Sequence, residues 1–118
     1  MDIDVIVLDA LKPVLNNTWS VELPPKPVFP AAVFEIETSP ENNWSTGGAF
    51  PAYEQHTVAV VVMAKTKTQL KTLMAQANVA MQAIAGYLQQ GHSGDAQYED
   101  DASVYGYYTN HIIRTQRY

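Results

Sequence analysis

The sequence predicts an α+β protein in which one long helix packs on a mixed, mostly antiparallel sheet of four to five strands, with a short helix at the N-terminus. A strand between Tyr53 and Ala64 carries apolar side chains on both of its faces, so both faces need a cover. One cover is a helix that follows directly, because apolar residues recur there at steps of three and four. These residues are Leu70, Leu73, Met74, Ala77, Met81, Ile84 and Leu88.

Composition limits the class of protein. With 118 residues, 47% hydrophobic and 16% charged, the chain predicts a single folded α+β domain over residues 1–118. The formal net charge of −5 opposes general binding to nucleic acid or to an anionic membrane. The chain has no cysteine, which excludes disulfides, thiolate metal sites and cysteine nucleophiles. It also has no basic leader and no apolar run long enough for a membrane helix, so we expect a soluble, unexported protein.

The N-terminal half predicts a helix, two strands and a loop. The first helix covers residues 1–15 and should kink or end near Lys12, because an interior proline at position 13 removes a hydrogen bond. Residues 19–23 predict an edge strand, and a proline-rich connector leads to a strand over residues 31–38, with Val33 and Ile36 among its buried candidates.

The polar loop over residues 39–51 contains Trp44 and Phe50. A loop of this length is uncommon in a compact domain unless it has a function. Large aromatic side chains in it need either their own core or a partner. We expect the loop to order against another protein, with Trp44 and Phe50 as interface residues; the alternative is that Trp44 covers its own core.

The second half predicts the long helix and a closing strand. Thr66 and Gln69 fit a capping box at the helix start. The helix is expected to run to about Gln90, where Gly91 stops it. Residues 92–97 predict a turn, and residues 98–101 are candidates to pair with a tyrosine-rich strand over residues 104–117.

The outer face of the long helix is nearly free of charge. No charged residue occurs between Lys71 and Asp95, so that face consists of Gln, Asn, Ala and Thr, which indicates contact with protein. Gln76 and Gln82 are candidate interface residues on it. Lys65, Lys67 and Lys71 flank the helix start, where the macrodipole disfavours cations, so an acidic group on a neighbouring subunit is a reasonable partner.

No pattern in the chain predicts catalysis, a cofactor or a metal. His56, His92 and His111 do not follow the spacing of a zinc site. The acidic residues at 95–101 miss the spacing of a calcium-binding loop. There is no nucleophile elbow, and no glycine-rich phosphate loop follows a strand. We therefore expect no enzyme, no catalytic residue, no cofactor and no metal.

The order of these segments resembles the tail-terminator, or tail-completion, proteins of long-tailed bacteriophages. The resemblance rests on an N-terminal helix, the proline-rich connector that ends in residues 29–34, the strand that begins at residues 53–60 with a helix directly after it, and residues 98–101 before a tyrosine-rich closing strand. It covers nearly the whole chain, in order and in length.

The resemblance implies a structural virion protein of the phage tail, assembled in the bacterial host cytoplasm. Such a protein forms a homo-oligomeric ring, typically a hexamer, on the end of the tail tube. The ring stops polymerisation of the tail-tube protein and joins the tail to the head–tail connector protein, while DNA passes through without specific binding. The alternative is a small oligomeric α+β ligand-binding or regulatory domain that dimerises through its sheet.

Overall fold

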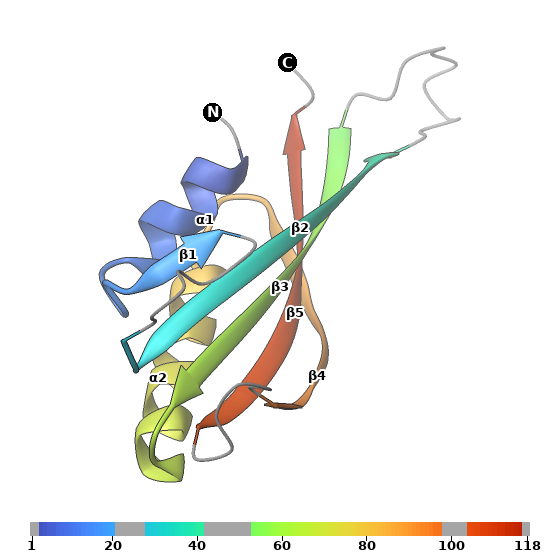
Figure 1. The fold of residues 1–118 in the computed structure, drawn as a ribbon. Helices are drawn as coiled ribbons and strands as arrows, with labels where there is room; N and C mark the ends of the chain where they lie inside the picture. The colour runs from blue at the N-terminus through green and yellow to red at the C-terminus, as the bar shows by residue number, and fades with distance from the viewer. Residues whose placement is uncertain (1–2, 21–27, 42–52, 98–103, 117–118) are drawn as a thin grey trace, which may run out of the picture.

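The computed structural model describes residues 3–20, 28–41, 53–97 and 104–116. They form two helices and a five-stranded mixed sheet, so the predicted α+β fold is correct (Figure 1). In chain order the elements are α1 (Ile3–Leu11), β1 (Thr18–Ser20), β2 (Ala31–Glu41), β3 (Tyr53–Ala64), α2 (Lys67–Gln82), β4 (Tyr87–Gln97) and β5 (Tyr105–Gln116).

The sheet has the strand order β1-β2-β3-β5-β4. Only the pair of β1 and β2 is parallel, and β1 is the short edge strand that the sequence predicts. The long strands β2, β3 and β5 pair antiparallel along their lengths, so Val60 in the central strand lies between Phe34 and Thr109. This register decides which side chains share a face, because neighbours across a ladder point the same way.

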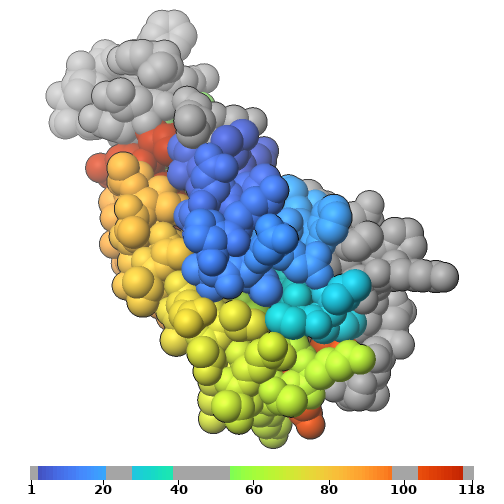
Figure 2. Space-filling view, turned by 90° about the vertical axis from the view of Figure 1, so that its left-hand side faces the viewer, coloured from blue at the N-terminus to red at the C-terminus, as the bar shows by residue number. Residues whose placement is uncertain are grey.

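One apolar core lies between the helices and one face of the sheet. Every second residue of β3 from His56 to Ala64 is buried there, together with Ala32 and Phe34 of β2 and Thr109, His111 and Ile113 of β5. The helices contribute Val7 and Leu11 from α1 and Leu70, Met74, Ala77 and Met81 from α2. Both helices therefore cover the same face of the sheet, and in Figure 2 α1 lies next to both β1 and α2.

The end of α1 and the start of α2 agree with the sequence prediction. α1 ends at Leu11, and a turn follows in which the amide of Leu15 donates to the carbonyl of Leu11 at 2.9 Å. Thr66 caps α2, since its hydroxyl oxygen accepts from the amide of Gln69 at 3.2 Å. The predicted capping residue and the predicted break near Lys12 are both confirmed.

The end of the long helix differs from the prediction. α2 ends at Gln82, not near Gln90, and residues 87–97 form β4 rather than a helix end and a turn. The turn between α2 and β4 ends at Gly86, whose positive φ of 89° favours glycine. The carbonyl of Gly86 accepts a hydrogen bond from the amide of Arg114 at 2.9 Å. Leu88, expected on the buried helix face, lies in β4 and is 45% exposed.

The expected loop over residues 39–51 also begins later. β2 extends through Glu41 and pairs with β3 as far as Tyr53. Residues 42–52 and the predicted pairing segment 98–101 lie outside the described residues. β5 instead pairs with β4, through a ladder with two register shifts.

Candidate protein-interaction surfaces

The second face of the sheet is free of helices in the described part of the chain. We call it the helix-free face and define it by Trp19, Val33, Ala59, Val61, Tyr108 and Ile112. Their register places them together: Trp19 pairs with Val33, Val33 with Val61, and Val61 with Tyr108. All but Trp19 are half-buried, and Trp19 is 41% exposed. Met63 and Ala31, at one end of this face, are buried.

Trp19 is held in place by its neighbours. Thr18 points toward the helices, where its hydroxyl donates to the carbonyl of Leu15, so the alternation of the strand turns Trp19 to the other face. Its indole Nε1 donates to Oδ1 of Asn17 at 3.0 Å, and Nδ2 of Asn17 donates to the carbonyl of Val28. An exposed, oriented tryptophan is typical of an interface residue.

The ring of Tyr108 lies over Gly94 of β4, toward the edge of the sheet opposite β1. A Cβ added to Gly94 in β4 would lie 3.2 Å from Cε1 of Tyr108, so the ring covers the position where a larger residue in β4 would stand. An aromatic and aliphatic stripe therefore crosses the sheet from β1 to β4. Glu35 and Glu37 in β2 point to the same face beside it and are exposed.

The outer face of α2 is the second candidate surface. Gln76 and Gln82 are exposed, as predicted from the sequence, and Val79 between them is 67% exposed. Ala75 and Ala83 are exposed on the same side, whereas Ala77 and Met81 point to the core. Between Gln76 and Ala83 this face is neutral and partly apolar, a composition that suits contact with protein.

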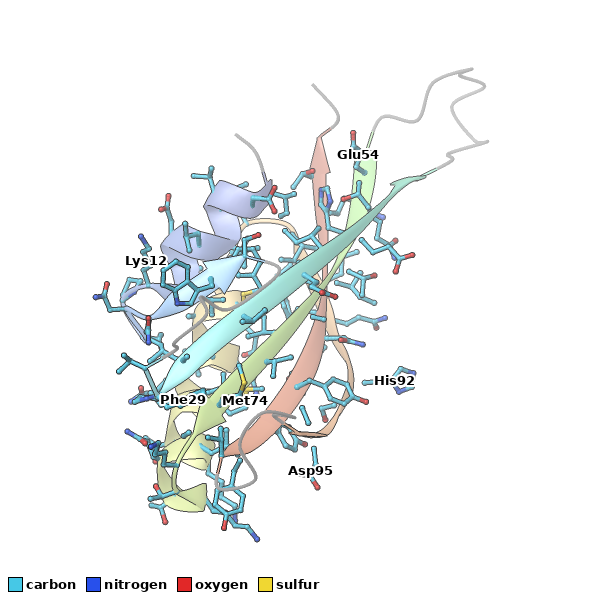
Figure 3. All side chains as sticks on the ribbon, in the orientation of Figure 1. Lys12, Phe29, Glu54, Met74, His92 and Asp95 are labelled. Atoms are coloured by element: carbon cyan, nitrogen blue, oxygen red, sulfur yellow. The ribbon has the colours of Figure 1, made fainter. Side chains whose placement is uncertain are left out.

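The three lysines of the prediction lie together at the start of α2. Lys65, Lys67 and Lys71 are all exposed. Nζ of Lys67 lies 5.5 Å from the centroid of the Tyr105 ring, a cation–π contact that keeps it beside β5. The acidic Glu54 lies at the opposite end of β3 (Figure 3), about 35 Å from Lys65 by the rise of a strand.

The buried histidines belong to the interior of the sheet. The ring nitrogens of His56 lie 2.7 Å from the hydroxyl oxygens of Thr38 and Thr115, which joins β2, β3 and β5. Nδ1 of His111 lies 2.8 Å from the hydroxyl oxygen of Tyr87. Burial lowers the pKa of His111 to about 4, and burial raises the pKa of Tyr87.

These contacts give both histidines a structural role. Across the described ranges, Nε2 of His111 and Oγ1 of Thr109 are buried without a hydrogen-bond partner. His92 is exposed and projects from β4 away from the helices (Figure 3). The three histidines therefore do not meet, and among the residues that the structure describes there is no group of three or more metal-ligating side chains.

Trp44 and Phe50, the aromatic interface candidates of the sequence, lie outside the described residues. The structure adds Trp19, which sequence reasoning did not single out as an interface residue, and it places Tyr108 of the tyrosine-rich strand on the same face. Trp19 gave a partial signal, because it lies in a predicted edge strand, but its neighbours on the sheet become visible only through the register. Within the described segments, no helix has the length and apolar character needed to cross a membrane.

Comparison with models of known protein families gives no match, and comparison with curated protein sequences gives no significant match. The function is therefore inferred from these surfaces and from the resemblance of the sequence.

Proposed function

We propose that this protein is a structural subunit of a phage tail: a tail terminator that forms a ring on the end of the tail tube, stops its polymerisation and joins the tail to the head connector. The observation that carries the proposal is the helix-free face. It exposes Trp19 in one row with the half-buried Val33, Val61 and Tyr108, and a contiguous apolar patch of this kind is typical of a contact with another protein.

The chemistry of the described surfaces supports assembly over catalysis. The neutral outer face of α2 and the helix-free face point away from the core in opposite directions, so one subunit offers two different contact surfaces (Figure 1). Contacts between two unlike surfaces produce rings or filaments, whereas a contact of one surface with itself produces a dimer. A ring of this kind would be a homo-oligomer, with the tail-tube protein and the connector protein as its further partners.

Charge favours free passage of DNA through such a ring. Each chain carries 12 acidic against 7 basic residues, and a closed ring multiplies this excess. An acidic lumen gives the phosphate backbone no counterion-releasing contacts and therefore no strong grip.

The test measures mass and end-capping together. The purified chain is sized by light scattering and viewed by negative-stain electron microscopy, then added to polymerising tail-tube protein encoded in the same genome. The proposal predicts rings of about six subunits, alone or on tube ends, and tubes that stop growing. A dimer that leaves tube growth unchanged would refute it and favour the regulatory domain.

A further inference from the structure

The helix-free face carries acidic residues on one side only. Among the described residues that point to this face, Glu35 and Glu37 of β2 are the acids, while β3 and β5 contribute aliphatic, aromatic and uncharged polar side chains, with Arg114 near the C-terminal end of β5. Any surface that covers this face should be apolar or neutral over the stripe and basic beside β2.

The outer face of α2 has this arrangement. Its C-terminal half presents the exposed Val79 between neutral residues, and the exposed Lys71 lies toward its N-terminal end. In the subunit itself this face is turned away from the sheet, because Leu70, Met74, Ala77 and Met81 occupy the side that meets the core. It is therefore available to another chain.

We infer that the outer face of α2 in one copy packs on the helix-free face of the next copy. The inference rests on the proposed function, because it names the two surfaces through which the ring forms. It gives the central strands a helix on each face, the arrangement that a strand with two apolar faces requires.

The spacing of the charged and apolar groups agrees on the two surfaces. Lys71 and Val79 are eight residues apart on α2, which is about 12 Å along the helix axis. Glu35 and Tyr108 are two strands and two residues apart on the sheet, which is also about 12 Å. Lys71 can therefore meet Glu35 while Val79 rests on the stripe at Val61 and Tyr108.

This contact joins unlike surfaces, so it predicts an asymmetric pattern of cross-links. The chain has no cysteine, so single cysteines can be introduced without background. Val79→Cys subunits mixed with Val61→Cys subunits should form an intersubunit disulfide under mild oxidation. Neither variant alone should cross-link. Ala59→Cys serves as a second sheet variant, because it adds only one sulfur atom and tests the same face.

The matched control is Val5→Cys, on α1. Val5 is 44% exposed, so its thiol is accessible, but the contact does not include it. Mixed with Val61→Cys it should give no disulfide. Cross-linking of Val61→Cys with itself would show that two sheets meet face to face, and this would overturn the inference. The absence of a disulfide in both mixtures with Val79→Cys would overturn it as well.

Charge reversal provides an independent readout. Lys71→Glu and Glu35→Lys should each weaken assembly by about tenfold or more, because each places like charges opposite one another. The association constant of the double variant should return to within about threefold of that of the original chain. Lys12→Glu, which changes the net charge by the same amount at an exposed site on the turn after α1, should have little effect. Equal losses in the single and double variants would contradict the pairing.

The two proposals fail in different ways. Rings that cap tail tubes but give no disulfide between Val79→Cys and either sheet variant would overturn the contact and leave the terminator function standing. The disulfide without any ring or capping of tubes would establish the contact and refute the terminator function.

Discussion

The hydroxyl of Tyr87 lies 2.8 Å from Nδ1 of His111, and this contact joins the first residue of β4 to the middle of β5 beneath α2. Their rings are 5.6 Å apart between centroids and tilted by 53°. His111 has no exposed surface, so its neutral form is strongly preferred in the folded protein.

This pair makes stability depend on pH. The pKa of His111 is about 4 in the fold and ordinarily 6.5, so between these values the unfolded chain binds a proton that the folded chain does not. The free energy of unfolding should therefore fall as pH falls from about 6.5 to 4, by up to about 1.4 kcal/mol for each pH unit. Urea unfolding at a series of pH values measures this. His111→Gln should reduce the slope, whereas His92→Gln, at an exposed site, should retain it. An unchanged slope in His111→Gln would contradict the assignment.

Removing the hydroxyl of Tyr87 should lower the free energy of unfolding by more than removing the hydroxyl of Tyr107. Tyr87→Phe leaves Nδ1 of the buried His111 without its partner, which should lower the free energy of unfolding by about 1–3 kcal/mol. In Tyr107→Phe the lost contact is the 3.2 Å hydrogen bond to the exposed Ser93, and water can replace it. We expect the free energy of unfolding of Tyr107→Phe to fall by less than about 1 kcal/mol. Chemical denaturation of the two variants in parallel provides the comparison, and equal losses would disagree with it.

The turn after α2 depends on Gly86. Alanine there would occupy a positive φ, and its Cβ would overlap the carbonyl oxygen of Arg114, only 2.0 Å away. Gly86→Ala should therefore lower the free energy of unfolding by more than the roughly 1–2 kcal/mol of the left-handed conformation alone. At Gly91 the added Cβ would lie 3.3 Å from Cβ of Asn110, a contact that a small shift relieves, so Gly91→Ala is the matched control. Thermal unfolding of both variants tests this, and a stable Gly86→Ala would refute it.

Trp19 should matter for assembly more than for folding. Its side chain is 41% exposed, so Trp19→Ala should lower the stability of the monomer by less than the loss of a fully buried tryptophan would. If the helix-free face is an interface, a buried tryptophan anchor is typically worth about 2 kcal/mol or more, and assembly should weaken by tens-fold. Val5→Ala, an exposed apolar residue on α1, is the control. Sedimentation of both variants beside their unfolding midpoints separates the two effects. A large loss of stability without a change in assembly would assign Trp19 to the fold.

Charge placed on the outer face of α2 should disrupt assembly. Gln76→Glu or Gln82→Glu introduces a negative charge into a neutral surface and should raise the concentration needed for association by about tenfold. Gln90→Glu makes the same chemical change at an exposed site in β4 and should have a smaller effect. Light scattering over a concentration series gives the answer, and unchanged association in both helix variants would exclude this face.

The sequence by itself determined the elements whose signals are local. The alternation from His56 to Ala64 depends on the geometry of one strand, the cap at Thr66 on a hydrogen bond over three residues, and the end of α1 on Pro13. Each of these causes lies within a few residues of its effect, so the residues alone were sufficient.

Only the tertiary structure decided the path after Gln82 and the composition of the two surfaces. Leu88 continues the helical spacing, and Gly91 and Gly94 have low strand propensity, yet β4 forms because β5 supplies hydrogen-bond partners for its backbone. Pairing between segments far apart in the sequence likewise brings Trp19, Val61 and Tyr108 to one face and Tyr87 to His111. Such contacts depend on strand order and register, which no local pattern of side chains specifies.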